Sequence, residues 1–407
     1  MASSKLWEAP CSSGANLPLD VLFFEVLLCL PAKELCRLRA VCRSWNAITR
    51  DSMFTKAHAS RHTDPLFVVT FWEGKNSWDC DANLGVSIMD MSGNVVKRIP
   101  IGKVIYWINL LPTRLDLVCL DIPGKGIGIL NPSSGKSEML PRCHNGYTRP
   151  RTRAGETHAF GLVASTGQYK MVRIVHLDHH FHNPSLHLCE VITLAKNYDK
   201  TWRRKRCAPV IVSPGHTSRR GGFMKNVVLD GIVYFMMDAG TTEPAGLVPF
   251  NLETEKWMAT IPGPGSLHNL VGYEQPYRNY FELNQALSVA NLRSCLVTVH
   301  NVRHSSVDLW FLRDVKTGLW VKTYSVSIQY DGLYSHNESY PLLVLNDGRI
   351  VFYKRQYEDT SKPQMHLLQS YDPETNGYTN LFEIKNVCSS CVGIYTGNLL
   401  SSKSDSC

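Results

Sequence analysis

A short two-strand pattern recurs along most of this chain of 407 residues and limits the folds open to it. In each copy an apolar strand ends at Asp or Asn, a tight polar turn follows, and a second strand begins. The side chain of Asp or Asn can bond its own backbone two residues on, which explains why this residue type recurs at the turn. The clear copies are SIMDMSGNVVKRIP, GILNPSSGKSEMLP, VPFNLETEKWMATIP, WFLRDVKTGLWVKTYSV and LQSYDPETNGYTNLFEI.

The spacing of these hairpins predicts a β-propeller. The first strands end at Asp90, Asn131, Asn251, Asp314 and Asp372. A weaker copy, CEVITLAKNYDKTWRRKR, has Trp202 opening its second strand. With that copy included, each unit has about 40 to 65 residues, the size of one four-stranded blade with its loops. Residues 65–397 then favour six blades of about 55 residues over seven of about 48. A tandem of β-sandwiches is the alternative, but it does not explain the recurring hairpin.

The first sixty residues follow a helical period instead. Between residues 17 and 50, apolar side chains recur at the three- and four-residue spacing of an amphipathic helix. Pro18 suits a first helical turn, whereas Pro31 cannot continue a helix, so the pattern predicts a break near Leu30 and three short helices. Such a small unit carries more large apolar side chains than its own core can hide. We therefore expect either a partner or the following domain to cover part of it.

This stretch resembles the F-box motif almost position by position, from Leu17-Pro18 through Leu30-Pro31 to Val41-Cys42 and Trp45, with Ser52-Met53-Phe54 after it. The resemblance implies that the helical unit docks onto a Skp-type adaptor, which in turn joins a cullin scaffold. It implies that a set of apolar residues either fills the adaptor's groove or holds the helices in shape. That set is Leu17, Pro18, Leu22, Val26, Leu27, Leu30, Pro31, Leu35, Val41, Cys42 and Trp45.

The β-rich remainder is similar to the F-box-associated domain that follows the F-box in many plant proteins. The segments that carry this resemblance include FGLVASTGQYKMVRIV, FMKNVVLDGIVYFMM and YPLLVLNDGRIVFY. Standard kelch repeats would need a Gly-Gly doublet in each blade, and only Gly221-Gly222 offers one. We therefore expect a mainly β chain with a small N-terminal α domain. Its parts would be a disordered N-terminus (1–15), a three-helix F-box domain (16–61), a β-propeller (65–397) and a flexible tail (398–407).

Together the two resemblances imply a substrate-recognition subunit of an SCF-type ubiquitin ligase, which bridges the adaptor to a target protein and does no catalysis itself. A propeller enzyme and an F-box scaffold acting outside the ligase are the alternatives. The target itself is not named by the sequence. We expect its contacts in the least regular segments, which are 142–158, 178–187, 200–222 and 331–339.

Charged residues do not indicate a nucleic-acid partner. The net charge of +8 is dilute over 407 residues. Three short basic clusters stand out: Arg149, Arg151 and Arg153; Arg203 to Arg206; and Arg219 with Arg220. For each we favour a solvated loop over a phosphate site, and a nuclear localisation signal at Arg203 to Arg206 is a weak match.

No residue pattern predicts a catalytic, cofactor or metal site. His176, His179, His180, His182 and His187 form the densest group of metal-ligand types, and we expect a surface or loop cluster. Cys388 and Cys391 lack a second pair, and we expect buried thiols. Trp202, Trp257, Trp310 and Trp320 are expected in blade cores.

The thirteen cysteines and the N-terminal sequence indicate the compartment. An odd number of scattered cysteines, with no apolar leader before them, favours free thiols in the cytoplasm, the nucleus or both. The most apolar run, residues 21–30, is far shorter than the ~20 residues that a membrane span needs. We expect no membrane association.

Overall fold

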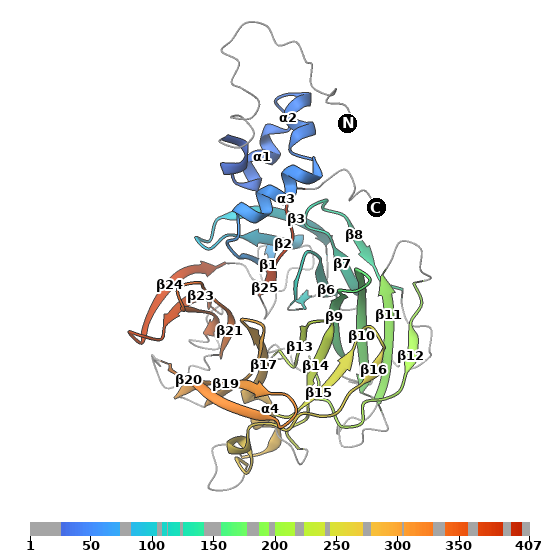
Figure 1. The fold of residues 1–407 in the computed structure, drawn as a ribbon, viewed down its shortest axis with the longest axis vertical. Helices are drawn as coiled ribbons and strands as arrows, with labels where there is room; N and C mark the ends of the chain where they lie inside the picture. The colour runs from blue at the N-terminus through green and yellow to red at the C-terminus, as the bar shows by residue number, and fades with distance from the viewer. Residues whose placement is uncertain are drawn as a thin grey trace, which may run out of the picture.

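The computed structural model consists of a small helical unit above a ring of β-sheets (Figure 1). It describes residues 26–73, 83–103, 108–111, 113–122, 125–141, 156–176, 187–194, 200–215, 224–240, 245–271, 278–302, 305–328, 338–356, 365–385 and 392–400. Within these ranges, no helix has the length and apolar character that crossing a bilayer requires.

The helical unit is built from four short helices in the described residues. They are η2 (Leu27–Cys29), α1 (Ala32–Leu38), α2 (Arg43–Ile48) and α3 (Ser52–Arg61). The predicted break at Pro31 is confirmed, because Pro31 is extended and α1 begins at the next residue. The Asp51 carboxylate caps α3 by accepting hydrogen bonds from the backbone N–H groups of Met53 (2.8 Å) and Phe54 (3.1 Å).

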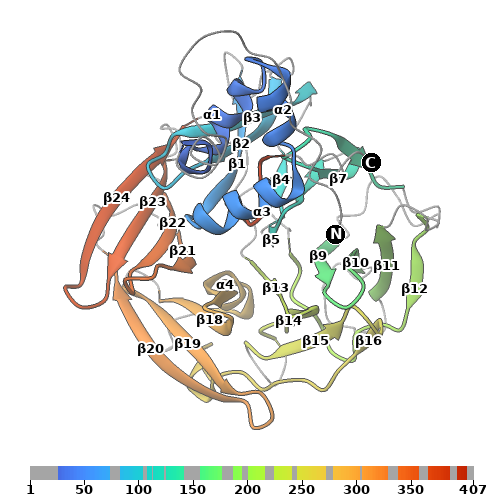
Figure 2. The same cartoon turned by 45° about the horizontal axis from the view of Figure 1, so that its top comes forward.

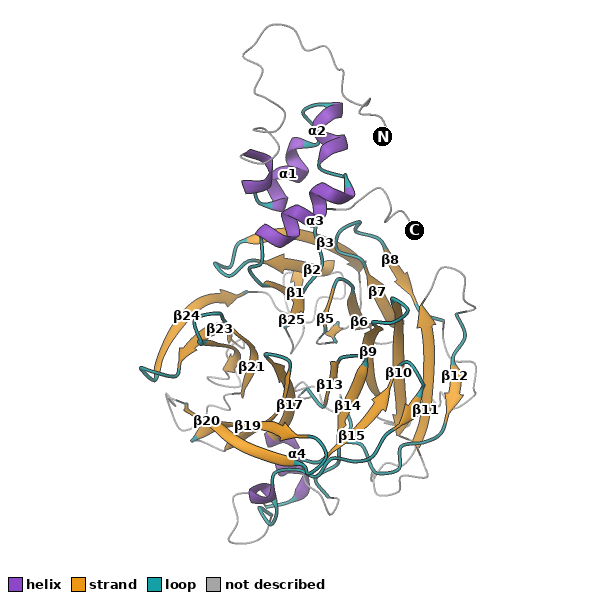
Figure 3. Ribbon diagram, in the orientation of Figure 1, coloured by secondary structure: helices purple, strands orange, loops and turns teal. Residues whose placement is uncertain are grey.

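The described strands form six sheets, which are the six blades predicted (Figure 3). Blade 1 holds β1 (Leu66–Glu73), β2 (Asn83–Met89), β3 (Val95–Lys103), β5 (Arg114–Leu115) and β25 (Gly393–Tyr395), and blade 2 holds β4 (Asn109–Leu110), β6 (Val118–Ile122), β7 (Gly126–Leu130) and β8 (Ser137–Met139). Blade 3 holds β9 (Glu156–Val163), β10 (Gln168–His176), β11 (His187–Leu194) and β12 (Arg203–Lys205), and blade 4 holds β13 (Asn226–Leu229), β14 (Ile232–Met236), β15 (Leu247–Asn251) and β16 (Lys256–Trp257). Blade 5 holds β17 (Leu287–Leu292), β18 (Cys295–Val302), β19 (Ser306–Asp314) and β20 (Leu319–Ser327), and blade 6 holds β21 (Glu338–Val344), β22 (Ile350–Gln356), β23 (Met365–Asp372) and β24 (Gly377–Ile384). Two further helices, η4 (Gly265–Leu267) and α4 (Tyr280–Ala286), belong to the segment of chain that connects blade 4 to blade 5.

The recurring sequence hairpin is the outermost pair of strands in each blade. Its turn residue acts as predicted, because the side-chain oxygen at the turn start accepts a backbone N–H two or three residues on. This bond is made at Asp90, Asn131, Asn251, Asp314 and Asp372. The weak sixth copy likewise supplies two antiparallel strands, β11 and β12, whose connecting residues 195–199 lie outside the described part.

Aromatic residues at the start of the outermost strands join neighbouring blades. The Trp202 indole donates a hydrogen bond to Pro141 O of blade 2 (2.8 Å), and that of Trp257 donates to Arg206 O after blade 3 (2.8 Å). Two further bonds follow the same plan: Trp320 Nε1 to Pro262 O (2.7 Å) and Tyr378 OH to Ser327 O (2.9 Å). The tryptophan rings also pack against the blade cores, as predicted.

The last strand closes the ring on the first blade. β25 pairs antiparallel with β1, with Ile394 opposite Phe67, and parallel with β5, with Ile394 opposite Arg114. The Arg114 guanidinium donates to Asn291 O (2.6 Å) in β17 and to Leu342 O in β21. Burial lowers the pKa of Arg114 to about 10. This one side chain therefore ties the closing blade to the first strands of blades 5 and 6.

The two faces of the ring differ in the connections they carry. β1 begins beside α3, and strand direction alternates within each antiparallel blade, so the outer hairpin turns face the helical unit. We call this side the turn face. The opposite side, the loop face, receives the ends of β3, β8, β12, β16, β20 and β24, where the chain passes to the next blade. Figure 2 brings the helical unit forward over blade 1.

Candidate functional site

The core of the helical unit contains two of the predicted adaptor-binding residues. Leu27 and Leu35 are 0% exposed and pack with Ile48 and Phe54. Leu30 and Trp45 are partly buried against the same cluster. In this structure these residues hold the short helices together, the second of the two roles that the resemblance implied.

Other predicted residues remain on the surface of the unit. Val26 is 37% and Val41 64% exposed, and Pro31 and Cys42 are exposed as well. Met53, at 77% exposed, joins them and was missed from the sequence. The helical period of α3 could have revealed this exposure, because a helix that turns Phe54 towards the core turns the preceding residue, Met53, towards solvent. We call Val26, Pro31, Val41, Cys42 and Met53 the exposed apolar set; Leu17, Pro18 and Leu22 lie outside the described residues.

Two histidines, His58 in α3 and His62 just after it, fix the segment that carries part of this set. His58 Nε2 lies 2.9 Å from Leu30 O, and His62 Nε2 lies 3.0 Å from Leu28 O. A carbonyl can only accept, so each ring must carry its proton on Nε2 to make these bonds. The rings stack with centroids 4.1 Å apart. Burial lowers the pKa of His58, which favours its neutral form.

The helical unit is fastened to blade 1 and to the end of the chain. Lys33 Nζ donates to Val95 O (3.0 Å), and Asn398 Nδ2 donates to Thr55 O (2.5 Å). Leu400 is 2% exposed and lies in the core of the helical unit. Our prediction of a flexible tail over 398–407 is therefore wrong for residues 398–400, because the apolar side chain of Leu400 is stabilised by burial in a core about 350 residues away in sequence. The remaining residues, 401–407, lie outside the described part.

The histidine cluster is not a surface feature where the structure describes it. His176 and His187, at facing ends of β10 and β11, are 0% and 1% exposed. His176 Nδ1 lies 3.2 Å from His187 Nε2, and Thr157 Oγ1 lies 3.1 Å from His176 Nε2. Burial lowers the pKa of His176 to about 3, so the ring is neutral. The structure does not describe His179, His180, His182, Cys388 or Cys391. Within the residues that it does describe, no three metal-ligand side chains lie close enough together to hold a metal ion.

The basic run Arg203 to Arg206 is not a loop as a whole. Arg203–Lys205 form strand β12, because they pair with Val191, Glu190 and Cys189 of β11. The loop interpretation of this cluster was therefore wrong, whereas the hairpin pattern that began at Trp202 was right. The clusters at 149–153 and 219–220 lie outside the described residues.

The segments expected to contact a target share one face of the ring where their ends are described. On the loop face, β8 ends and β9 begins. β10 ends and β11 begins there too, and likewise β20 ends and β21 begins there. β12 also ends there. Most of 142–158, 178–187 and 331–339, and the end of 200–222, lie outside the described residues, so the expected contacts stay a prediction.

Comparison with known proteins adds to this geometry. A family model described as F-box associated beta propeller domain matches residues 99–393, and one described as F-box-like matches residues 15–58. Two similar Arabidopsis thaliana proteins are F-box protein At1g47810, 24% identical over 83% of this chain and 95% of its own, and F-box protein At3g07870, 23% identical over 90% and 87%. A solved structure of a protein of unknown function from Bacteroides caccae aligns with 81% of this chain and 98% of its own, at 12% identity and a TM-score of 0.40.

Proposed function

The chain belongs to the family of F-box proteins with an F-box associated β-propeller, and on that premise we propose that it is the substrate-recognition subunit of an SCF-type ubiquitin ligase. The observation that supports this most is the exposed apolar set on a helical unit whose own core is already filled. Large apolar side chains left on the surface of so small a unit are typical of an interaction site.

We propose that the exposed apolar set docks onto a Skp-type adaptor, together with Leu17, Pro18 and Leu22. A cullin would join through the adaptor. In a helix-in-groove contact, a few well-packed anchors supply most of the binding energy, at about 2 to 4 kcal/mol each on truncation. Leu27 and Leu35 would act indirectly, by holding the helices in the docking geometry.

In this proposal the chain does no covalent chemistry. It would hold a target bound to the propeller near the ubiquitin-conjugating enzyme, which raises the effective concentration of the target's lysine. The fastening of the helical unit by Lys33, Asn398 and Leu400 supports this role, because a fixed angle between the two parts limits where the target can lie.

A binding assay with a matched control tests the adaptor contact. Full-length protein carrying Val41→Asp and Met53→Asp should lose at least about tenfold in affinity for a purified Skp-type adaptor, because each change puts a charge in an apolar contact. The matched control carries Met258→Asp and Val315→Asp, at residues of the propeller that are 44% and 53% exposed. It makes the same two kinds of change elsewhere and should bind as the unaltered chain does. Equal adaptor affinity in all three proteins, or no capture of cullin through the adaptor, would overturn the proposal.

We also propose that the protein resides in the cytoplasm, the nucleus or both, because cysteine thiols stay reduced in these compartments. The support is the scattered set of thirteen cysteines. A fluorescent fusion of the full chain that accumulated in the secretory pathway would contradict it.

A further inference from the structure

The outermost strand of blade 3 carries a concentrated positive charge. β12 is the last strand of its sheet, so one of its edges has no partner strand among the described residues. Its three residues and the next one are Arg203, Arg204, Lys205 and Arg206, which we call the basic edge. The edge ends on the loop face, the side to which the expected target segments lead.

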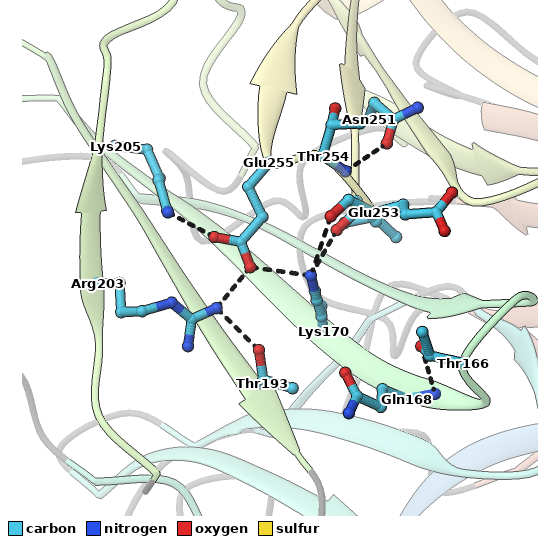
Figure 4. A network of polar contacts seen from close by, with 11 residues as sticks. Thr166, Gln168, Lys170, Thr193, Arg203, Lys205, Asn251, Glu253, Thr254 and Glu255 are labelled. Carbon is cyan, nitrogen blue, oxygen red and sulfur yellow. Dashed lines mark hydrogen bonds and ion pairs between the residues drawn. The ribbon is translucent and has the colours of Figure 1, made fainter. Parts of the chain in front are cut away.

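Part of this charge is held in place by one carboxylate of blade 4 (Figure 4). Glu255 lies 2.9 Å from Lys170 Nζ, 2.5 Å from Arg203 Nη2 and 2.6 Å from Lys205 Nζ. Burial alone would raise the pKa of Glu255, but hydrogen bonds from Lys205, Lys170 and Arg203 lower it to about 2. Glu255 has a φ of +55°, a conformation that residues with a side chain rarely adopt. The turn thus accepts local strain while its carboxylate meets three cations.

One carboxylate does not balance these cations. Lys170 and the basic edge carry five positive charges, and the ion pairs they make among the described residues all end on Glu255. Glu190, opposite Arg204 on β11, instead lies 3.7 Å from Arg173. Arg204 and Arg206 are exposed, and neither side chain makes an ion pair or hydrogen bond within the described part of the chain. Arg203 and Lys205 keep about a third of their side-chain surface open to solvent, at 34% and 27%. The site is therefore ordered and still electropositive.

We propose that the basic edge is the docking surface for an extended acidic segment of a target protein, which adds to β12 as a further strand. The free edge offers backbone N–H and C=O groups at strand spacing, which another polypeptide can pair with and a nucleic acid cannot. Charges on an edge strand repel ordinary strands and so prevent aggregation. A strand of opposite charge escapes that repulsion, so the same residues that exclude most chains would select an acidic one. The partner's identity as a target rests on the proposed function, but the binding itself does not.

The test uses full-length protein and synthetic probes in a fluorescence anisotropy titration at about 0.1 M salt. A labelled peptide of alternating Glu and Thr should bind, because it is acidic and forms strands readily. The double variant R204Q/R206Q should weaken this binding by at least about tenfold, since it removes the two unpaired cations without touching the Glu255 network. K316Q/K385Q makes the same charge change at exposed lysines of blade 5 and after blade 6, and should leave the affinity within about twofold.

Several outcomes would overturn the inference. These are no binding of the Glu/Thr peptide, an equal loss in both double variants, or equal affinity for a peptide of alternating Glu and Pro, which cannot pair as a strand. Tighter binding of a short oligodeoxythymidine would assign the edge to nucleic acid instead. Adaptor affinity, measured on the same R204Q/R206Q sample, should not change. Unaltered protein that binds the Glu/Thr peptide but does not bind the adaptor would count against the ligase role alone.

Discussion

Replacing Trp320 by phenylalanine keeps an aromatic ring in the core of blade 5 but removes the indole N–H that donates to Pro262 O of blade 4. Trp310, in the same blade, offers the matched comparison. Its ring also packs against a blade core, but its Nε1 is buried and makes no hydrogen bond among the described residues. The two substitutions thus delete the same atoms, and only one of them breaks an inter-blade bond.

The expected costs follow from hydrogen-bond energetics. Losing this part-buried hydrogen bond costs about 0.5 to 1.5 kcal/mol, whereas removing an unmatched buried donor regains part of a desolvation penalty of about 1 to 3 kcal/mol. The loss of ring area is common to both variants. We therefore expect W320F to lower the free energy of unfolding by about 1 to 3 kcal/mol more than W310F does. W202F and W257F break the corresponding bonds at exposed positions, so each should cost less than W320F does. The three costs should add, since each residue lies in a different blade.

Equilibrium unfolding in urea, followed by circular dichroism, measures these differences. The slope of unfolding free energy against urea should be the same for W320F and W310F, so that a shift in midpoint reports stability alone. Should W310F prove as destabilised as W320F, the inter-blade hydrogen bond would contribute nothing and the reasoning would fail.

Three further predictions concern the joint, the buried histidines and the charge network. Leu400→Ala should loosen the helical unit at a cost of about 2 to 5 kcal/mol, because it opens a cavity in that core, and limited proteolysis between α3 and β1 should become faster; an unchanged cleavage rate would count against the packing role. Burial lowers the pKa of His176 to about 3 and of His300 and His366 to about 4, below the unfolded value near 6.5. The unfolded chain therefore binds more protons as pH falls from 6.5 towards 4, so stability is lost in that window, by roughly 2 kcal/mol for each histidine at pH 5; equal melting temperatures at pH 7 and 5 would contradict this. Glu255→Gln should cost about 2 kcal/mol or more, since it leaves three facing cations, and the cost should shrink as salt screens their repulsion; a salt-independent cost in a melting series would refute the electrostatic cause.

The features that the sequence predicted correctly rest on short-range interactions. Asp90 and Asp314 bond backbone groups two residues on, and Pro31 ends a helix by its own ring geometry. Such effects need only a few neighbouring residues, so the hairpins, the helix break and the blade repeat are visible in the sequence. Six blades followed because the hairpin recurs once per blade.

The features that the sequence did not predict join residues far apart. Leu400 enters a core built from residues 27 to 54, and Arg114 reaches carbonyls of Asn291 and Leu342. The pairing of His176 with His187 depends on how β10 and β11 align, which the spacing of the two residues in the sequence does not give. Exposure was also undecided: Leu35 and Val41 match the same motif, yet one is buried and the other 64% exposed.

For this protein, the amino-acid sequence by itself determined the type and number of repeating units and the presence of a helical unit before them. Period and turn chemistry are properties of a few consecutive residues. Only the tertiary structure decided which apolar residues stay on the surface of that unit, how the chain's end fastens it, and which cations of blade 3 remain unbalanced. Burial and charge pairing depend on which distant segments meet, and closing the ring brings those segments together.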